Sequence, residues 1–299
     1  MPRMRSRSIV RGQSRAGLSE RSIKAVILGV LCLLVIIPFM SVFSTSVAPR
    51  EQIAEAGGLV LVPQGLDLTA YRALFSGGVV TRALAVSMFV TVVGTALSLL
   101  VSCLLAYAIS RPYFVLARPI LLVVLIGMLF SPGIIPVYLV VKETGLLDSL
   151  WALIIPTMVS GFNVIVLRSF FQNIPGELTE SATIDGAGEW AIFARIVMPL
   201  SKAVLAVIGL FYAVGYWNTF FTALLYISDT SKWPMQLVLR TYVVNDTAMG
   251  QADLATEFLP PQASLQMAIL VVSMVPILLI YPFLQKHFAK GVLTGAVKG

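Results

Sequence analysis

Residues 83–110 read ALAVSMFVTVVGTALSLLVSCLLAYAIS, which is 28 consecutive positions without a charged side chain. A helix rises about 1.5 Å per residue, so about 20 apolar residues are enough to cross the roughly 30 Å hydrocarbon core of a membrane. Five other charge-free stretches have comparable length: 25–49, 119–141, 149–167, 203–228 and 258–285. The next longest, 56–66, has only 11 residues. The sequence therefore predicts an all-α membrane protein with six transmembrane helices.

The composition of the whole chain agrees with this prediction. Hydrophobic residues make up 58% and charged residues 12% of the 299 residues, and the mean hydropathy is +0.92. A soluble protein usually has about twice that charged fraction. The first apolar stretch also resembles a signal peptide, because it follows a basic N-terminus. Its run from Ala25 to Phe43 is longer than the 7–15 residues typical of a signal-peptide core, which favours a retained helix.

The positions of Lys and Arg predict the orientation of the chain. With the N-terminus inside, 15 of the 21 basic residues lie on the cytoplasmic side, which leaves six outside. This asymmetry follows the positive-inside rule and places both termini in the cytoplasm. The net charge of +7 is then explained by contact with anionic membrane lipid, and no nucleic-acid partner is expected.

The expected organisation is a membrane domain, 25–285, between a basic cytoplasmic tail, 1–24, and a cytoplasmic C-terminal tail, 286–299. The Pro132-Gly133 pair, together with Pro136, predicts a kinked or broken third helix. Two polar segments, an inner one at about 172–199 and an outer one at 228–264, are too long for simple turns, so function is expected there. The six expected helices are 25–47, 83–110, 119–141, 150–171, 200–227 and 265–285.

Several kinds of chemistry are missing from the chain. No charged residue lies deep in an expected helix, which disfavours, without excluding, a secondary carrier driven by an ion gradient. The serines of the spans have no His, Asp or Glu beside them, so no intramembrane hydrolase is expected. The chain contains no Gly-Lys pair, so it lacks a phosphate-binding loop. Its two cysteines and single histidine do not form a metal site.

The inner segment is predicted to form two short helices. The first spans about 177–184 and ends at Asp185-Gly186, where glycine can adopt a left-handed conformation. The second ends at Pro199. Its apolar residues follow the i, i+3, i+4, i+7 spacing of one helix face. Such a ridge is suited to a groove on another protein or to the lipid headgroups, and the spacing alone leaves both open. The ridge consists of Trp190, Phe193, Ala194 and Val197.

The same segment resembles a known signature. Its spacing is similar to the EAA loop of permease subunits of ABC importers, which it matches at Glu180, Ala182, Gly186, Ile196 and Pro199. The fuller form found in carbohydrate importers also has Asp185, Ala187 and Phe193, and all three are present. Ser181 and Met198 are mild departures. In that family the loop is a coupling helix that sits in a cleft of an ATPase subunit. The resemblance thus implies ATPase-coupling roles for Glu180, Ser181, Ala182, Asp185, Gly186, Ala187, Trp190, Phe193, Ile196 and Pro199.

The resemblance extends over all six expected helices. The stretch 199–218 is similar to the smaller permease of oligosaccharide importers, and 291–299 resembles the tail of the maltose-type permease. That resemblance implies that Gly291, Thr294 and Lys298 reach the ATPase dimer. The chain's resemblance is closest to the branch of the family that handles complex or uronic-acid-containing oligosaccharides.

The resemblance also implies a set of partners in the bacterial plasma (inner) membrane. They are a second homologous permease, an ABC ATPase dimer that holds ATP and Mg, and an extracytoplasmic sugar-binding protein that meets residues 228–264. The chain itself would bind no cofactor and perform no catalysis. It would translocate a sugar or oligosaccharide. The alternatives are an ion-coupled secondary carrier and a non-transporting membrane scaffold or receptor.

Aromatic residues of the fifth expected helix suggest where a sugar might pass. Tyr212, Tyr216 and Phe220 have i, i+4, i+8 spacing. Aromatic rings stack on sugars, and amides bond to sugar hydroxyls, but rings at this spacing also pack in cores or line membrane interfaces. Both interpretations stay open for the candidate pathway residues Asn163, Tyr212, Tyr216, Trp217 and Asn218.

Overall fold

A computed structural model describes the backbone of residues 18–244 and 260–296 and the side chains of 22–243 and 260–280. Every regular element within those ranges is helical. Residues 1–17 of the basic tail, 245–259 of the outer segment and Lys298 lie outside them.

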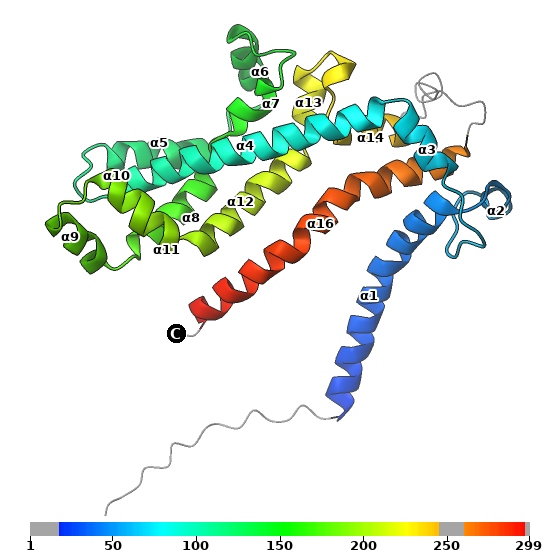
Figure 1. The fold of residues 1–299 in the computed structure, drawn as a ribbon, viewed down its shortest axis with the longest axis horizontal. Helices are drawn as coiled ribbons and strands as arrows, with labels where there is room; N and C mark the ends of the chain where they lie inside the picture. The colour runs from blue at the N-terminus through cyan, green and yellow to red at the C-terminus, as the bar shows by residue number, and fades with distance from the viewer. Residues whose placement is uncertain (1–17, 245–259, 297–299) are drawn as a thin grey trace, which may run out of the picture.

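Figure 1 shows helices arranged around one long helix, α4. The elements are α1 (Leu18–Val47), α2 (Arg50–Glu55), α3 (Thr69–Ser76), α4 (Val79–Ser110), α5 (Ala117–Leu129), α6 (Ile134–Glu143), α7 (Trp151–Ile154), α8 (Gly161–Gln172), α9 (Gly176–Ile184), α10 (Glu189–Ile192), α11 (Met198–Leu200), α12 (Lys202–Trp217), α13 (Phe221–Tyr226), α14 (Met235–Val244) and α16 (Gln262–Ala296).

Three helices of the described chain are long and apolar enough to cross a membrane: α1, α4 and α16. Three bent pairs raise the number to as many as six if each pair is one span: α5 with α6, α7 with α8, and the Glu189–Leu200 helix with α12. The expected spans 25–47, 83–110 and 265–285 thus correspond to continuous helices, and 119–141 and 150–171 correspond to bent pairs. The expected span 200–227 overlaps α12 but not the Glu189–Leu200 helix of the third pair, which belongs to the inner segment. α16 continues to Ala296, past the expected end at residue 285.

α4 is the centre of the fold because one of its faces is lined by small residues. Buried Gly94, Ser98 and Ser102 recur at intervals of about one turn on this face, which lets α12 pack closely against it. The approach is tightest at Gly94, where an added Cβ would lie 2.8 Å from the ring of Tyr216. The Tyr216 hydroxyl is hydrogen-bonded to Ser98, which limits how far the ring can move.

We expect Gly94→Val to destabilise the protein for this reason. Overpacking a tight helix contact costs about 1–3 kcal/mol, so the midpoint of thermal unfolding in detergent should fall. The control is Gly127→Ala in α5, where an added Cβ meets nothing within 4 Å. That change should be neutral or stabilising, because alanine is the better helix former. Equal unfolding midpoints for Gly94→Val and the wild type would contradict the close contact.

The predicted break in the third helix is confirmed. α5 ends at Leu129 and α6 begins at Ile134, with a bend of 120° between them. Pro132 cannot donate a backbone hydrogen bond, and Gly133 has φ +85°, a conformation that favours glycine. The fourth helix also contains a break that was not predicted, although Pro156 lies within it. α7 and a 3-10 turn, Ile155–Thr157, meet α8 at 52°.

The expected continuous helix 200–227 is wrong. α12 ends at Trp217, and a short separate helix, α13, begins at Phe221. The side chains of Asn218 and Thr219 bond back to the carbonyls of Val214 and Gly215, at 2.9 and 3.3 Å. Polar side chains that bond to backbone groups in this way compete with helix continuation. Phe220 therefore does not continue the row formed by Tyr212 and Tyr216.

The first helix is joined to the rest near its Val47 end. Buried Thr45 accepts a hydrogen bond from the Val60 backbone N–H at 2.8 Å, and Ser46 bonds to the Tyr71 hydroxyl at 2.8 Å. From Ile23 to Met40 the helix is apolar and largely exposed. It packs against α16, and Figure 1 shows the two helices diverging away from the α2–α3 region. The long face of α1 is thus left open to lipid or a second protein.

Candidate functional site

The inner segment forms two helices joined by a tight turn, as predicted. α9 ends at Ile184, and Gly186 has φ +84°, the left-handed conformation expected for it. Two backbone bonds close the turn: Gly186 N–H to Thr183 at 3.0 Å and Ala187 N–H to Ala182 at 2.9 Å. This bonding pattern matches a common helix C-cap, and it fixes the angle at which the second helix leaves.

The second helix ends at Leu200, one residue after the predicted Pro199. α10 continues through a π-helical turn, Phe193–Val197, into α11, and the chain bends by 82° only around Ser201. We call residues 189–200 the coupling arm. A π-helical turn widens the backbone immediately before the proline, which relieves the clash that its ring causes in a regular α-helix.

The predicted ridge is not one exposed surface. Phe193 and Val197 are only 6% and 2% exposed and pack in the protein's own core. Trp190 is 72% exposed, and Ile184 of α9 is 87% exposed. The ridge is divided in this way because the arm lies against α4, which buries one side of the apolar stripe. The exposed apolar tip is therefore formed by Ile184 and Trp190.

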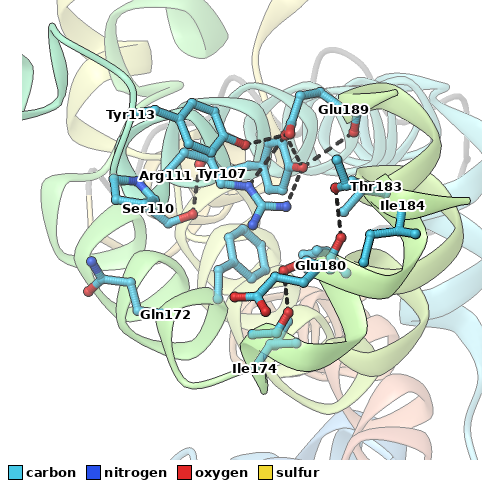
Figure 2. A pocket seen from close by; sticks show the side chains of 16 residues that line it. Tyr107, Ser110, Arg111, Tyr113, Gln172, Ile174, Glu180, Thr183, Ile184 and Glu189 are labelled. Atoms are coloured by element: carbon cyan, nitrogen blue, oxygen red, sulfur yellow. Dashed lines mark hydrogen bonds and ion pairs between the residues drawn. The ribbon is translucent and has the colours of Figure 1, made fainter. Parts of the chain in front are cut away.

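A polar cluster that the sequence did not predict joins the coupling arm to the Ser110 end of α4. Figure 2 shows Glu189 facing Tyr107, Arg111 and Tyr113. The Glu189 carboxylate accepts hydrogen bonds from the hydroxyls of Tyr107, at 2.6 Å, and Tyr113. Arg111 Nε lies 3.4 Å from Glu189 Oε2, an ion-pair distance. We call these four residues the Glu189 cluster.

The members of the Glu189 cluster also contact one another. The Tyr107 hydroxyl accepts a hydrogen bond from an Arg111 terminal nitrogen, and the guanidinium lies 4.4 Å from the centre of the Tyr107 ring. The other side of the arm is tied in by the Phe193 ring, 4.9 Å from the Tyr107 ring. Burial opposes ionisation of Glu189, but the two tyrosine bonds and Arg111 outweigh it and lower the pKa of the carboxyl. Glu189 is therefore an anion at neutral pH.

A cavity of about 810 Å³ lies beside the Glu189 cluster, between the arm, α9 and the ends of α4 and α8. Of the predicted coupling residues, only Glu180 lines it, together with Gln172, Thr183 and Ile184 from the same region. Ala182 and Ala187 pack against the core. The acid of the EAA-like spacing thus faces a solvent-accessible hollow, while Trp190 stands outside it.

Four of the five candidate pathway residues line one cavity. Asn163, Tyr212, Tyr216 and Asn218 line a second cavity, of about 530 Å³, and Trp217 does not. Both tyrosines are buried, and their hydroxyls bond to Ser102 and Ser98 of α4 at 2.7 and 2.8 Å. These rings hold α12 on α4. Asn218 is the one exposed candidate on the cavity wall, and exposed Phe162, Phe211 and Phe221 line it as well.

The opposite end of α4 is bonded to the described part of the 228–264 segment. Buried Ser87 accepts a hydrogen bond from the backbone N–H of Met235, at the start of α14, at 2.7 Å. Asp148 accepts bonds from the backbone N–H groups of Ser228 and Asp229, at 3.1 and 2.9 Å. Lys232 adds a bond to the Asp148 carbonyl at 2.9 Å. The two polar segments therefore lie at opposite ends of α4, as Figure 1 shows.

Residues 83–294 match the family described as binding-protein-dependent transport system inner membrane component. The polygalacturonan/rhamnogalacturonan transport system permease protein YtcP of Bacillus subtilis (strain 168) is 48% identical over 269 residues, which cover 89% of this chain and 94% of the relative. Protein LplC of the same organism is 45% identical over 273 residues, covering 91% and 92%.

A solved structure is similar over nearly the whole fold. It belongs to a bacterial ABC transporter involved in the import of the acidic polysaccharide alginate. The TM-score is 0.84 at 30% sequence identity, and the match covers 91% of this chain and 98% of that one.

Proposed function

Because this chain belongs to the family of binding-protein-dependent transport system inner membrane components, we propose that it is the permease subunit that moves an acidic oligosaccharide through an ATP-driven importer. The chain is a multi-pass inner-membrane protein with an all-α permease fold. The observation that carries the functional proposal is the coupling arm with its exposed tip, Ile184 and Trp190. A protruding apolar tip at one end of a membrane bundle is suited to docking in a groove of a partner.

The proposed importer contains four kinds of subunit. A second homologous permease completes the membrane part, a dimer of ATPase subunits binds ATP and Mg, and an extracytoplasmic protein delivers the sugar. The described part of this chain holds no group of three or more potential metal ligands. The ATPase subunits hydrolyse ATP and move the coupling arms, which changes the side of the membrane to which the permease pair opens.

The proposed role of each coupling residue follows from its position in the structure. Ile184 and Trp190 enter the ATPase groove, and Glu180 faces the cavity beside it. Gly186 shapes the turn between the two helices. Phe193 and Val197 anchor the arm to this chain's own core, and Pro199 lies just before the bend around Ser201. Gly291 and Thr294 lie on the backbone of α16, and their proposed contact with the ATPase dimer rests on the sequence resemblance.

An acidic oligosaccharide is the proposed cargo. Two similar proteins carry names that refer to such polymers, polygalacturonan and alginate. The cavity that contains Asn163 and Asn218 combines exposed aromatic rings with amides, a pairing suited to sugar faces and hydroxyls. The ion-coupled carrier receives no support from these relatives.

The test combines purification and transport. The tagged chain, purified in detergent, should bring with it an ATPase and a second permease. Liposomes containing that complex and its binding protein should take up an oligogalacturonate when ATP is supplied to the ATPase side. Uptake driven by a proton or sodium gradient without ATP would contradict the proposal. So would purification of this chain without an ATPase partner.

A further inference from the structure

We propose that the Glu189 cluster fastens the coupling arm to α4, and that α4 carries the arm's movement to residues 228–244, which we call the α14 segment, at its other end. The inference rests on the proposed function and adds a mechanical route to it. It makes Tyr107, Arg111, Tyr113 and Glu189 positioning residues for coupling. Each acts through the helix it holds, without contact with ATP or sugar.

The coupling arm is attached to the rest of the protein at both ends. At Leu200 it continues into α12 through the 82° bend. At Glu189 it is held to the Ser110 end of α4 by an ion pair and two tyrosine hydrogen bonds. An arm held only at the bend would pivot about it. An arm held at both ends moves α4 and α12 together, and those two helices are already packed against each other.

α4 is one unbroken helix, which makes it rigid along its length. This helix is continuous over 32 residues, or about 48 Å at 1.5 Å per residue. The helices between α4 and α16 in the chain are instead interrupted at residues 130–133, 158–160, 201 and 218–220. A displacement applied at the Ser110 end is transmitted along an unbroken helix, whereas a broken span absorbs movement at its break.

The far end of α4 is in contact with the α14 segment. Ser87 bonds to the backbone of Met235, and both residues are buried. The α14 segment is further fixed by the Asp148 and Lys232 contacts. α4 therefore links the ATPase-facing arm to the segment proposed to face the binding protein. This link provides a path by which a loaded binding protein on one side changes ATP hydrolysis on the other.

Charge-assisted bonds are suited to this role. They depend on direction and distance, so the cluster holds Glu189 in one position relative to Arg111. The Arg111 side chain is 16% exposed and that of Glu189 49% exposed, so the pair is only partly screened by water. Glutamine in place of Glu189 keeps the size of the side chain but removes the ion pair, and glutamine in place of Arg111 removes the cation.

The experiment measures the ratio of ATP hydrolysis with and without the binding protein loaded with oligogalacturonate, in the complete reconstituted importer. Glu189→Gln and Arg111→Gln are each expected to lower that ratio at least about fivefold, a typical size for coupling between distant sites. The double variant should be no worse than the more severe single one, because both changes break the same link. Arg118→Gln removes an exposed charge nearby and should leave the ratio unchanged.

A second readout tests the far end of α4. Thr230→Cys, in a Cys32→Ser background, places a thiol on the exposed part of the α14 segment. Its labelling rate by a membrane-impermeant maleimide should change when ATP and vanadate trap the complex. Glu189→Gln should abolish that change. If the glutamine variants do not assemble, Tyr113→Phe, which removes one exposed hydroxyl of the cluster, should lower both readouts partially.

The outcomes separate this inference from the proposed function. A wild-type complex with no ATPase partner, or with no stimulation by the loaded binding protein, overturns the proposed function. A wild-type complex that is stimulated normally, together with Glu189→Gln or Tyr113→Phe complexes that are stimulated equally well, overturns the role of the cluster. Additive effects in the double variant also overturn it. A normal labelling change in Glu189→Gln overturns transmission along α4.

Discussion

Replacing Gly186 by proline is expected to lower ATP hydrolysis stimulated by the loaded binding protein at least about fiftyfold, near the upper end of coupling effects. Gly186 has φ +84°, whereas proline is restricted to φ near −65°. Its backbone N–H also donates to Thr183, and proline has no such donor. The turn between α9 and the coupling arm must therefore rearrange, which displaces the exposed tip. The measurement is ATP hydrolysis by the reconstituted importer, alongside the amount of chain inserted in the membrane.

Gly188→Ala is the matched control for this change. Gly188 lies two residues further along the same turn, has φ −75°, and leaves open space around an added Cβ. Alanine adopts that conformation without strain, so stimulated hydrolysis should stay close to the wild-type rate. Membrane insertion should be normal for both variants. Wild-type stimulation in Gly186→Pro would show that the shape of the turn is irrelevant to coupling.

Replacing Glu180 by lysine is expected to lower ATP-driven uptake at least about tenfold. Glu180 lines the cavity that also contains Arg111, so the substitution puts a cation in place of an anion on the same cavity wall. The two positive groups repel each other, which disturbs the cavity beside the coupling arm. The measurement is the initial rate of oligogalacturonate uptake into liposomes, with co-purification of the ATPase recorded in parallel.

Glu177→Lys provides the same change of charge three residues earlier in α9. Glu177 is exposed and does not line the cavity. Its substitution should reduce uptake less than twofold, the range of ordinary surface changes. Equal losses for the two variants would mean that the net charge of α9 matters and the cavity does not. Normal uptake by Glu180→Lys would remove this residue from the coupling site.

The membrane fold was predictable because its main determinants are local. Charge-free stretches identify spans since a charged group in hydrocarbon is costly wherever it occurs. The break between α5 and α6 was predictable for a similar reason, because Pro132 limits the backbone whatever surrounds it. Gly186 belongs to the same class. Its left-handed conformation follows from its place at the end of a short helix.

Features that depend on distant contacts could not be predicted. α12 ends where the side chains of Asn218 and Thr219 bond back to backbone carbonyls. The apolar residues around them gave no sign of these bonds. The burial of Phe193 depends on the ring of Tyr107, 86 positions earlier in the chain. The Glu189 cluster combines α4, the turn after it and the arm. Its one local signal was the basic turn that begins at Arg111, directly after a long apolar helix.

The π-helical turn at Phe193–Val197 sets the phase of the coupling arm. Such a turn amounts to one residue inserted into an α-helix, and one residue corresponds to a rotation of about 100°. Deleting a single residue there would convert the arm to a regular helix and swing Trp190 and Glu189 by about that angle relative to α12. The length of the arm therefore fixes which side of its helix faces outward. Related chains with a one-residue gap at this place would present a different side of the helix to their ATPase.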